Sequence, residues 1–310
     1  MAKMAIRIEN LTRDYCNVRA VDGLSLEVPS GIIFGFLGPN GSGKTTTINL
    51  LLGLLEPTNG QAEVLGFDTR TQADEVRTRV GALLEHPGLY EQMTAEDNLE
   101  FYARVWRMPA ADRQARIKEL LASMEVWERR KDRVGTWSQG MKQKLALSRA
   151  LVHRPSLVFL DEPTAGLDVM AANEVREDLA ALAAREGVTV FLTTHNMTEA
   201  EKLCSLVAVI RQGKLLAVGH PDELRARAGG PQIEIVGRGF DENVLNLLRA
   251  RTEVAGIEGR GNHLSIHLRE EMDTAPLVSL LVSAGAQVEE VRKGQASLEE
   301  AFLALMEEER

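Results

Sequence analysis

The sequence has few cysteines and no long apolar run. Its 310 residues include two cysteines, Cys16 and Cys204, whose spacing suits neither a disulfide framework nor a metal site, so we expect free thiols in a reducing compartment. The longest apolar stretches, residues 31–38 and 48–55, are far shorter than the roughly 20 residues that cross a bilayer. The N-terminus lacks the pattern of a secretory signal. We therefore expect a cytoplasmic protein, and any path through a membrane has to come from another chain.

Positive charge is also scarce. The chain has 36 lysines and arginines against 45 acidic residues, which gives a formal charge of -9. This balance repels the phosphate backbone of nucleic acids, so we expect no nucleic-acid partner. Hydrophobic residues make up 44% of the sequence, and at this length they are enough for the core of one large domain and one small domain.

Short apolar runs alternate with longer helical patterns over most of the chain. The runs 31–37, 157–160 and 188–192 contain β-branched or aromatic residues and are followed by polar residues, as expected for buried strands of a parallel sheet. At about 95–150 the apolar residues recur mainly with helical spacing, which predicts a helical insert. The expected fold class is α/β, with a mainly parallel core sheet, an antiparallel β subdomain and this insert.

A second domain is predicted after residues 226–231, where alanine, glycine and proline gather. We assign residues 1–225 to the first domain and 231–310 to the second. In the second, the order strand, helix, strand, strand, helix, strand predicts a small ferredoxin-like α+β domain. Ser297 and Glu300 have the spacing of a capping box and predict the start of a closing helix.

A glycine-rich loop follows the first buried run. Residues 38–45, GPNGSGKT, match the pattern Gly-x4-Gly-Lys-Ser/Thr, and a helix is predicted to begin near Lys44. In such a loop the backbone N–H groups face phosphate oxygens, the lysine reaches the β and γ phosphates, and the Thr45 hydroxyl binds Mg²⁺. A simple glycine-rich turn is the alternative, but the strand before it and the helix after it favour a phosphate site. The predicted nucleotide-binding residues of this loop are Gly38, Pro39, Asn40, Gly41, Ser42, Gly43, Lys44, Thr45 and Thr46.

Two carboxylates follow the second apolar run, and a histidine follows the third. Because neighbouring side chains of a strand point in opposite directions, Asp161 and Glu162 are suited to different tasks. We assign Asp161 to Mg²⁺ and Glu162 to the general base that accepts a proton from the water attacking the γ phosphate. His195 is assigned to bond the γ phosphate and to hold that water. Solvated acids and a structural histidine are the alternatives.

The run WSQGMKQ at residues 137–143 narrows the choice among ATPases with such a loop. It resembles the signature motif of ABC transporter ATP-binding subunits, and residues 161–168, DEPTAGLD, resemble the acidic motif and the following loop of the same family. The resemblance covers residues 6–219. It implies that Ser138 and Gly140 contact the γ phosphate held by a second cassette, in a head-to-tail dimer that is expected to be a homodimer. Capping of the following helix is the structural alternative for the serine, and both roles are compatible.

The resemblance implies further site residues. Tyr15 resembles the family's adenine-stacking aromatic, and Asp168 ends the loop after the acidic motif, so both are included in the nucleotide site. Glu85 stands where glutamine is usual; a carboxylate still accepts hydrogen bonds from Mg²⁺-bound water but adds negative charge near the γ phosphate. We include it in the predicted metal site, with an ordinary exposed loop glutamate as the alternative. Gln139 within the signature resembles the drug- and antibiotic-exporter branch, as does the C-terminal domain, for which we expect dimer contact or regulation.

The predicted function is ATP binding and hydrolysis with Mg²⁺, which powers export of a drug, antibiotic or other amphipathic compound through a separate transmembrane permease. The helical insert and the loop of Glu85 are expected to face that permease at the inner face of the cell membrane. One alternative is an ABC ATPase that acts on ribosomes or DNA, although such relatives usually have paired cassettes or long coiled coils. Another is a cassette that binds ATP as a switch with little turnover, against which the intact catalytic residues argue.

Overall fold

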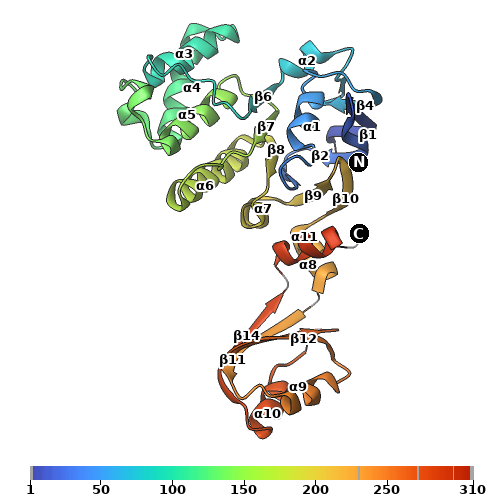
Figure 1. Ribbon diagram of the computed structural model, residues 1–310. Helices are drawn as coiled ribbons and strands as arrows, with labels where there is room; N and C mark the ends of the chain where they lie inside the picture. Colours follow the sequence, from blue (N-terminus) through green and yellow to red (C-terminus); the bar gives the residue numbers. More distant parts are fainter. Residues whose placement is uncertain (1–2, 230, 271, 296, 308–310) are drawn as a thin grey trace. The chain divides into compact units, whose positions relative to one another are not determined.

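The chain divides into two compact units, Met1–Val218 and Gly219–Arg310 (Figure 1). The computed structural model describes residues 3–229, 231–270, 272–295 and 297–307. The division lies at the end of strand β10 (Lys214–Gly219), upstream of the expected boundary at 226–231. The physical reason is that helix α8 (Pro221–Gly229) packs against α11 (Leu298–Glu307) and so belongs to the second unit.

A six-stranded sheet forms the centre of the first unit, in the order β10-β9-β3-β8-β7-β6. The neighbouring strands from β9 to β6 run parallel, so the segments that follow β3, β7 and β8 emerge at one edge of the sheet. The three predicted apolar runs form these three strands. The parallel strands are β9 (Leu206–Arg211), β3 (Ile33–Leu37), β8 (Thr189–Thr194), β7 (Leu157–Asp161) and β6 (Val80–Leu83).

Aromatic side chains hold the central strands together. Phe34 and Phe159 both pair in register with Phe191 on the strand between them, and their rings lie 5.2 and 5.5 Å from its ring. Phe36 lies at 5.5 Å from the same ring, and all four side chains are fully buried. Burying one phenylalanine stabilises a fold by roughly 1.5–3 kcal/mol. The cluster therefore helps to set which strand ends lie side by side.

An antiparallel sheet and helices complete the first unit. The sheet has the order β2-β1-β4-β5, and its alternating buried residues join the apolar core beneath it. The predicted insert is present as helices α3, α4 and α5, which pack on one another (Figure 1). The remaining elements are β1 (Met4–Tyr15), β2 (Val18–Pro29), α1 (Lys44–Leu51), β4 (Asn59–Val64), β5 (Phe67–Asp68), α2 (Ala73–Arg77), α3 (Ala95–Val105), α4 (Ala110–Ser123), the 3-10 turns Trp127–Arg129 and Val134–Thr136, α5 (Gln139–Leu151), α6 (Val169–Glu186) and α7 (Met197–Leu203).

A fully buried arginine ties the insert to the rest of the unit. Arg116 on α4 donates to both carboxylate oxygens of Glu186 at the end of α6, at 2.7 and 2.8 Å, and to the Leu151 carbonyl at 2.7 Å. A buried charge is tolerated only when it is paired and hydrogen-bonded. Loss of either partner would therefore leave a buried charge without compensation and would loosen the insert.

The second unit has a four-stranded antiparallel sheet in the order β12-β13-β11-β14, with α9 and α10 on one face (Figure 1). This order confirms the ferredoxin-like prediction. Ser297 and Glu300 bond each other's backbone N–H groups at 3.1 and 2.8 Å, which is the predicted capping box. The elements are β11 (Pro231–Arg238), α9 (Glu242–Arg249), β12 (Val254–Arg260), β13 (His263–Leu268), α10 (Ala275–Ser283) and β14 (Gln287–Gln295). Among the described residues of the chain, no helix is both long and apolar enough to cross a membrane.

Candidate nucleotide-binding site

The glycine-rich loop joins β3 to α1 and packs tightly against β2. Gly43 has a φ of 107°, and a Cβ atom there would lie 2.3 Å from the Ala20 carbonyl oxygen, so only glycine fits. Gly41 also takes a left-handed φ, of 79°. These conformations curl the backbone, and a curled loop before a helix N-terminus presents its N–H groups to a phosphate. The loop's shape therefore fits a nucleotide's phosphate chain.

Lys44 is a buried cation at the start of α1. Its side chain is 5% exposed, and its ammonium group donates to the Gly38 carbonyl at 2.8 Å and to the Pro39 carbonyl at 3.2 Å. It also lies 3.2 Å from Oε1 of Glu162. The structure thus places the lysine between the glycine-rich loop and Glu162, the first residue after β7.

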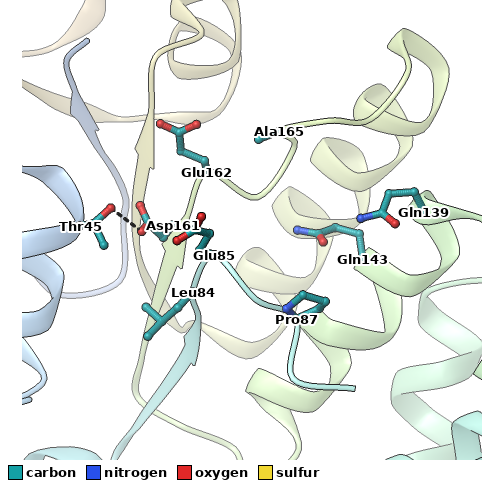
Figure 2. A pocket seen from close by; sticks show the side chains of 9 residues that line it. All are labelled: Thr45, Leu84, Glu85, Pro87, Gln139, Gln143, Asp161, Glu162 and Ala165. Atoms are coloured by element: carbon teal, nitrogen blue, oxygen red, sulfur yellow. Dashed lines mark hydrogen bonds between the residues drawn. The ribbon is translucent and has the colours of Figure 1, made fainter. Parts of the chain in front are cut away.

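The carboxylate of Asp161 is hydrogen-bonded on both oxygens. Oδ2 accepts from the Thr45 hydroxyl at 2.8 Å, and Oδ1 accepts from the Thr193 hydroxyl. Glu85, two residues beyond the end of β6, lines the same cavity as Asp161 (Figure 2). Carboxylate and hydroxyl oxygens are the hard ligands that Mg²⁺ prefers, so the residues present fit that ion.

Thr45, Glu85 and Asp161 line a cavity of about 410 Å³ (Figure 2). Residues from both sides of the fold contribute, because α5 of the insert faces the sheet edge across it. The lining residues are Thr45, Leu84, Glu85, Pro87, Gln139, Gln143, Asp161, Glu162 and Ala165.

Glu162 lies between Lys44 and His195. Its backbone has a φ of 49°, a left-handed conformation that is costly for a residue other than glycine and is typical of functional sites. Oε2 lies 3.0 Å from Nδ1 of His195. Because a carboxylate only accepts, Nδ1 carries the proton, which leaves Nε2 free for another partner.

Four predicted site residues lie apart from these groups. Ser138 accepts a bond from the Met141 N–H at 3.3 Å, so it does cap α5. Together with Gly140 and Asp168 it lines a separate cavity of about 430 Å³ rather than the one described above. Tyr15 is 39% exposed at the end of β1. Within one subunit, Ser138 and Gly140 therefore line a different cavity from Thr45, whereas Gln139 and Gln143 of the same run line the cavity of Thr45.

The sequence analysis missed two contributors. Thr193 bonds Asp161 through its hydroxyl, and both its carbonyl and its hydroxyl oxygen accept from the Glu162 N–H, at 3.0 and 3.1 Å. Gln143 lines the cavity and donates to the Pro163 carbonyl at 2.5 Å. A polar residue at the end of an otherwise apolar strand was the available signal for Thr193. Gln143 had no such signal, because its partner comes from a distant part of the chain.

Comparisons with known proteins agree with this geometry. Residues 21–165 match the family model described as "ABC transporter", and residues 219–306 match the C-terminal domain of DrrA1-3-like ATP-binding proteins. The daunorubicin resistance ATP-binding protein DrrA3 of Streptomyces coeruleorubidus is 35% identical over 313 residues, covering 100% of this chain and 98% of the relative. The chain belongs to the ATP-binding subunits of ABC transporters.

Other relatives of this ABC subunit support the same assignment. The bacitracin transport ATP-binding protein BcrA of Bacillus licheniformis is 40% identical over 222 residues, which are 72% of each chain. A solved ATP-binding subunit of an ABC transporter is 28% identical, with a TM-score of 0.64, and covers 72% of this chain and 92% of that one. The family resemblance and the predicted fold class are thus confirmed. As a member of this family the chain binds ATP, and such subunits work with a membrane permease.

Proposed function

We propose that this ABC subunit hydrolyses MgATP in a head-to-tail homodimer and so drives transport through a separate permease. The observation that carries the proposal is the contact of Glu162 with both Lys44 and His195, beside the Thr45–Asp161 pair at the same sheet edge. A cation, a base and a histidine that orients the base form a complete set for attack of water on a phosphate.

Each residue has a role that follows from its contacts. Lys44 donates to phosphate oxygens, and Glu162 accepts the proton of the attacking water. His195 orients Glu162 through Nδ1 and bonds the γ phosphate through Nε2. Thr45, Asp161 and Glu85 would hold Mg²⁺, directly or through water. When bound, this ion neutralises phosphate charge, which favours attack by water.

The dimer is inferred from the separation of Ser138 and Gly140 from the cavity of Thr45. Ser138 and Gly140 begin α5, whose N-terminal dipole attracts an anion. Because they line a different cavity from Thr45 and Asp161, they serve a nucleotide held by a second copy of the chain. Val169 and Met170 at the start of α6 are 77% and 76% exposed, and they supply apolar surface for that contact. In the assembled site Tyr15 stacks on adenine and Asp168 lies at the interface.

Mixed dimers test the composite site. Lys44→Ala removes the ammonium group that binds the phosphates. Ser138→Asp keeps the helix cap but places a negative charge against the γ phosphate. Each variant alone is expected to be inactive. A mixture of the two is expected to regain about a quarter of wild-type turnover, since half of the dimers are mixed and each of these has one intact site. Ser138→Asn, which caps without charge, is the matched control and should retain most activity; no recovery on mixing would refute the head-to-tail arrangement.

The proposed cargo is a drug, an antibiotic or another amphipathic compound that leaves the cell. The support comes from the relatives, which are named for daunorubicin resistance and bacitracin transport. In this arrangement the subunit sits at the cytoplasmic face of the membrane. The permease carries the cargo, so the choice of compound depends on that chain.

The proposed permease contact is a groove of about 220 Å³ between β6 and the insert. Its lining includes Leu54, Trp106 and the aromatic ring of Tyr102, which combine apolar surface with nearby cations. The Tyr102 hydroxyl donates to the Gly88 carbonyl, three residues beyond Glu85. A permease helix seated here would therefore displace the loop that carries Glu85.

Glu85→Gln is expected to change coupling more than nucleotide affinity. The substitution removes a negative charge from the cavity that Asp161 also lines but keeps an oxygen that accepts hydrogen bonds. The KM for MgATP should stay within about threefold, because Lys44 and the loop still bind the phosphates, whereas the stimulation of turnover by the permease should change by more than that. ATPase assays with and without the reconstituted permease measure both quantities. A large loss of ATP affinity would contradict the place given to this loop.

A further inference from the structure

Glu199 is a fully buried carboxyl in the first turn of α7. Its Oε1 accepts from the Thr164 hydroxyl at 2.9 Å, and its backbone N–H donates to the helix-capping Asn196 side chain at 3.2 Å. Burial raises the pKa of this carboxyl, and the hydrogen bonds of Thr194 and Thr164 and the charge of Arg176 oppose that effect. Burying a carboxyl group is costly in free energy, so a buried carboxyl next to the candidate site indicates a functional role.

Two side-chain links join the same pair of segments. Glu162 meets His195 at 3.0 Å near the surface, and Thr164 meets Glu199 beneath it at 2.9 Å. Glu162 and Thr164 lie in the segment after β7, and their partners lie in the segment after β8. The Ala165 N–H donates to the Glu162 carbonyl at 3.0 Å, so the residues between them form a tight turn. A displacement at Thr164 is therefore passed to Glu162.

The turn needs such an anchor. Glu162 has a left-handed φ of 49°, and a strained backbone of this kind persists only when surrounding contacts hold it. Its own side chain cannot supply the anchor, because the catalytic role requires it to exchange partners during the reaction. The Thr164 hydroxyl can, since its partner Glu199 is fixed in a helix and shielded from water.

We propose that Glu199 is a positioning residue: by holding the Thr164 hydroxyl, it fixes the turn that carries Glu162 and so orients the general base toward His195. The inference rests on the proposed role of Glu162 in ATP hydrolysis. Glu199 contributes to kcat through Thr164, and nucleotide binding does not depend on it.

The test is a double-mutant cycle in the full-length subunit. Glu199→Ala and Thr164→Val are each expected to lower kcat by about 10- to 100-fold, as small misplacements of a catalytic group do, with the KM for MgATP within twofold. The double variant should be no slower than the slower single variant, because both remove one link. Glu199→Gln keeps an acceptor for Thr164 and should stay within about threefold of wild type. Thr198→Val, at an exposed site on the same helix, is the matched control.

Other outcomes of the double-mutant cycle would contradict the proposal. Multiplicative losses in the double variant, or a Glu199→Gln variant as slow as Glu199→Ala, would overturn the proposal. A lower melting temperature with unchanged kcat, or a rise in KM without a fall in kcat, would also overturn it by assigning Glu199 a purely structural or a binding role. Full turnover in Glu162→Gln would instead refute the proposed function itself, so the two failures are distinguishable.

Discussion

Glu162→Gln is expected to lower steady-state ATP turnover by about 10²- to 10⁴-fold while ATP stays bound, the range that a general base contributes. In the wild-type structure, Nδ1 of His195 lies 3.0 Å from Oε2 of Glu162. Glutamine keeps an oxygen that accepts a hydrogen bond from this Nδ1, but its amide cannot take a proton from water at neutral pH. The Lys44 side chain keeps its two loop carbonyl partners. Binding therefore survives and the chemical step fails.

The ATP-bound dimer should accumulate in this variant, because hydrolysis no longer opens it. Size-exclusion chromatography with and without MgATP measures the dimer, and phosphate release measures turnover. Glu63→Gln, an exposed glutamate on β4, is the matched control and should behave as wild type. Normal turnover in Glu162→Gln would remove Glu162 from the role of base.

Lys44→Ala is expected to weaken both ATP binding and turnover, with kcat falling by about 10²- to 10³-fold. The substitution removes a nearly buried cation from the centre of the phosphate loop and leaves the Glu162 carboxylate without its 3.2 Å partner. That negative charge would then face the phosphates unscreened. The loss should therefore appear in Kd as well as in kcat, unlike the loss in Glu162→Gln.

Isothermal titration with MgATP and a phosphate-release assay separate the two effects. Lys44→Arg keeps the charge but not the compact ammonium group, so it should recover little activity. Lys293→Ala, an exposed lysine of the second unit, controls for general loss of positive charge. A Lys44→Ala subunit with wild-type Kd and kcat would show that another cation holds the phosphates.

Some residues of the candidate site were predictable because they belong to short sequence patterns. The phosphate loop needs glycines at fixed offsets for its backbone conformation, and Gly43 indeed has a φ of 107°. The acid pair and His195 follow apolar runs, and parallel strands bring such ends together. Gln143 and Glu199 could not be assigned in this way. Each acts through a partner on another element, and no short pattern encodes that partner.

The sequence by itself determined the types of element, the α/β class, the ferredoxin-like second unit and the chemical identity of the polar groups at the candidate site. These follow from backbone preferences and from the spacing of apolar residues, which are local properties. Only the tertiary structure decided that Lys44 pairs with Glu162, that Glu85 lines the same cavity as Asp161, and that Ser138 and Gly140 line a separate cavity. The reason is that strand order, buried packing and helix docking set these contacts, and all three depend on the whole chain.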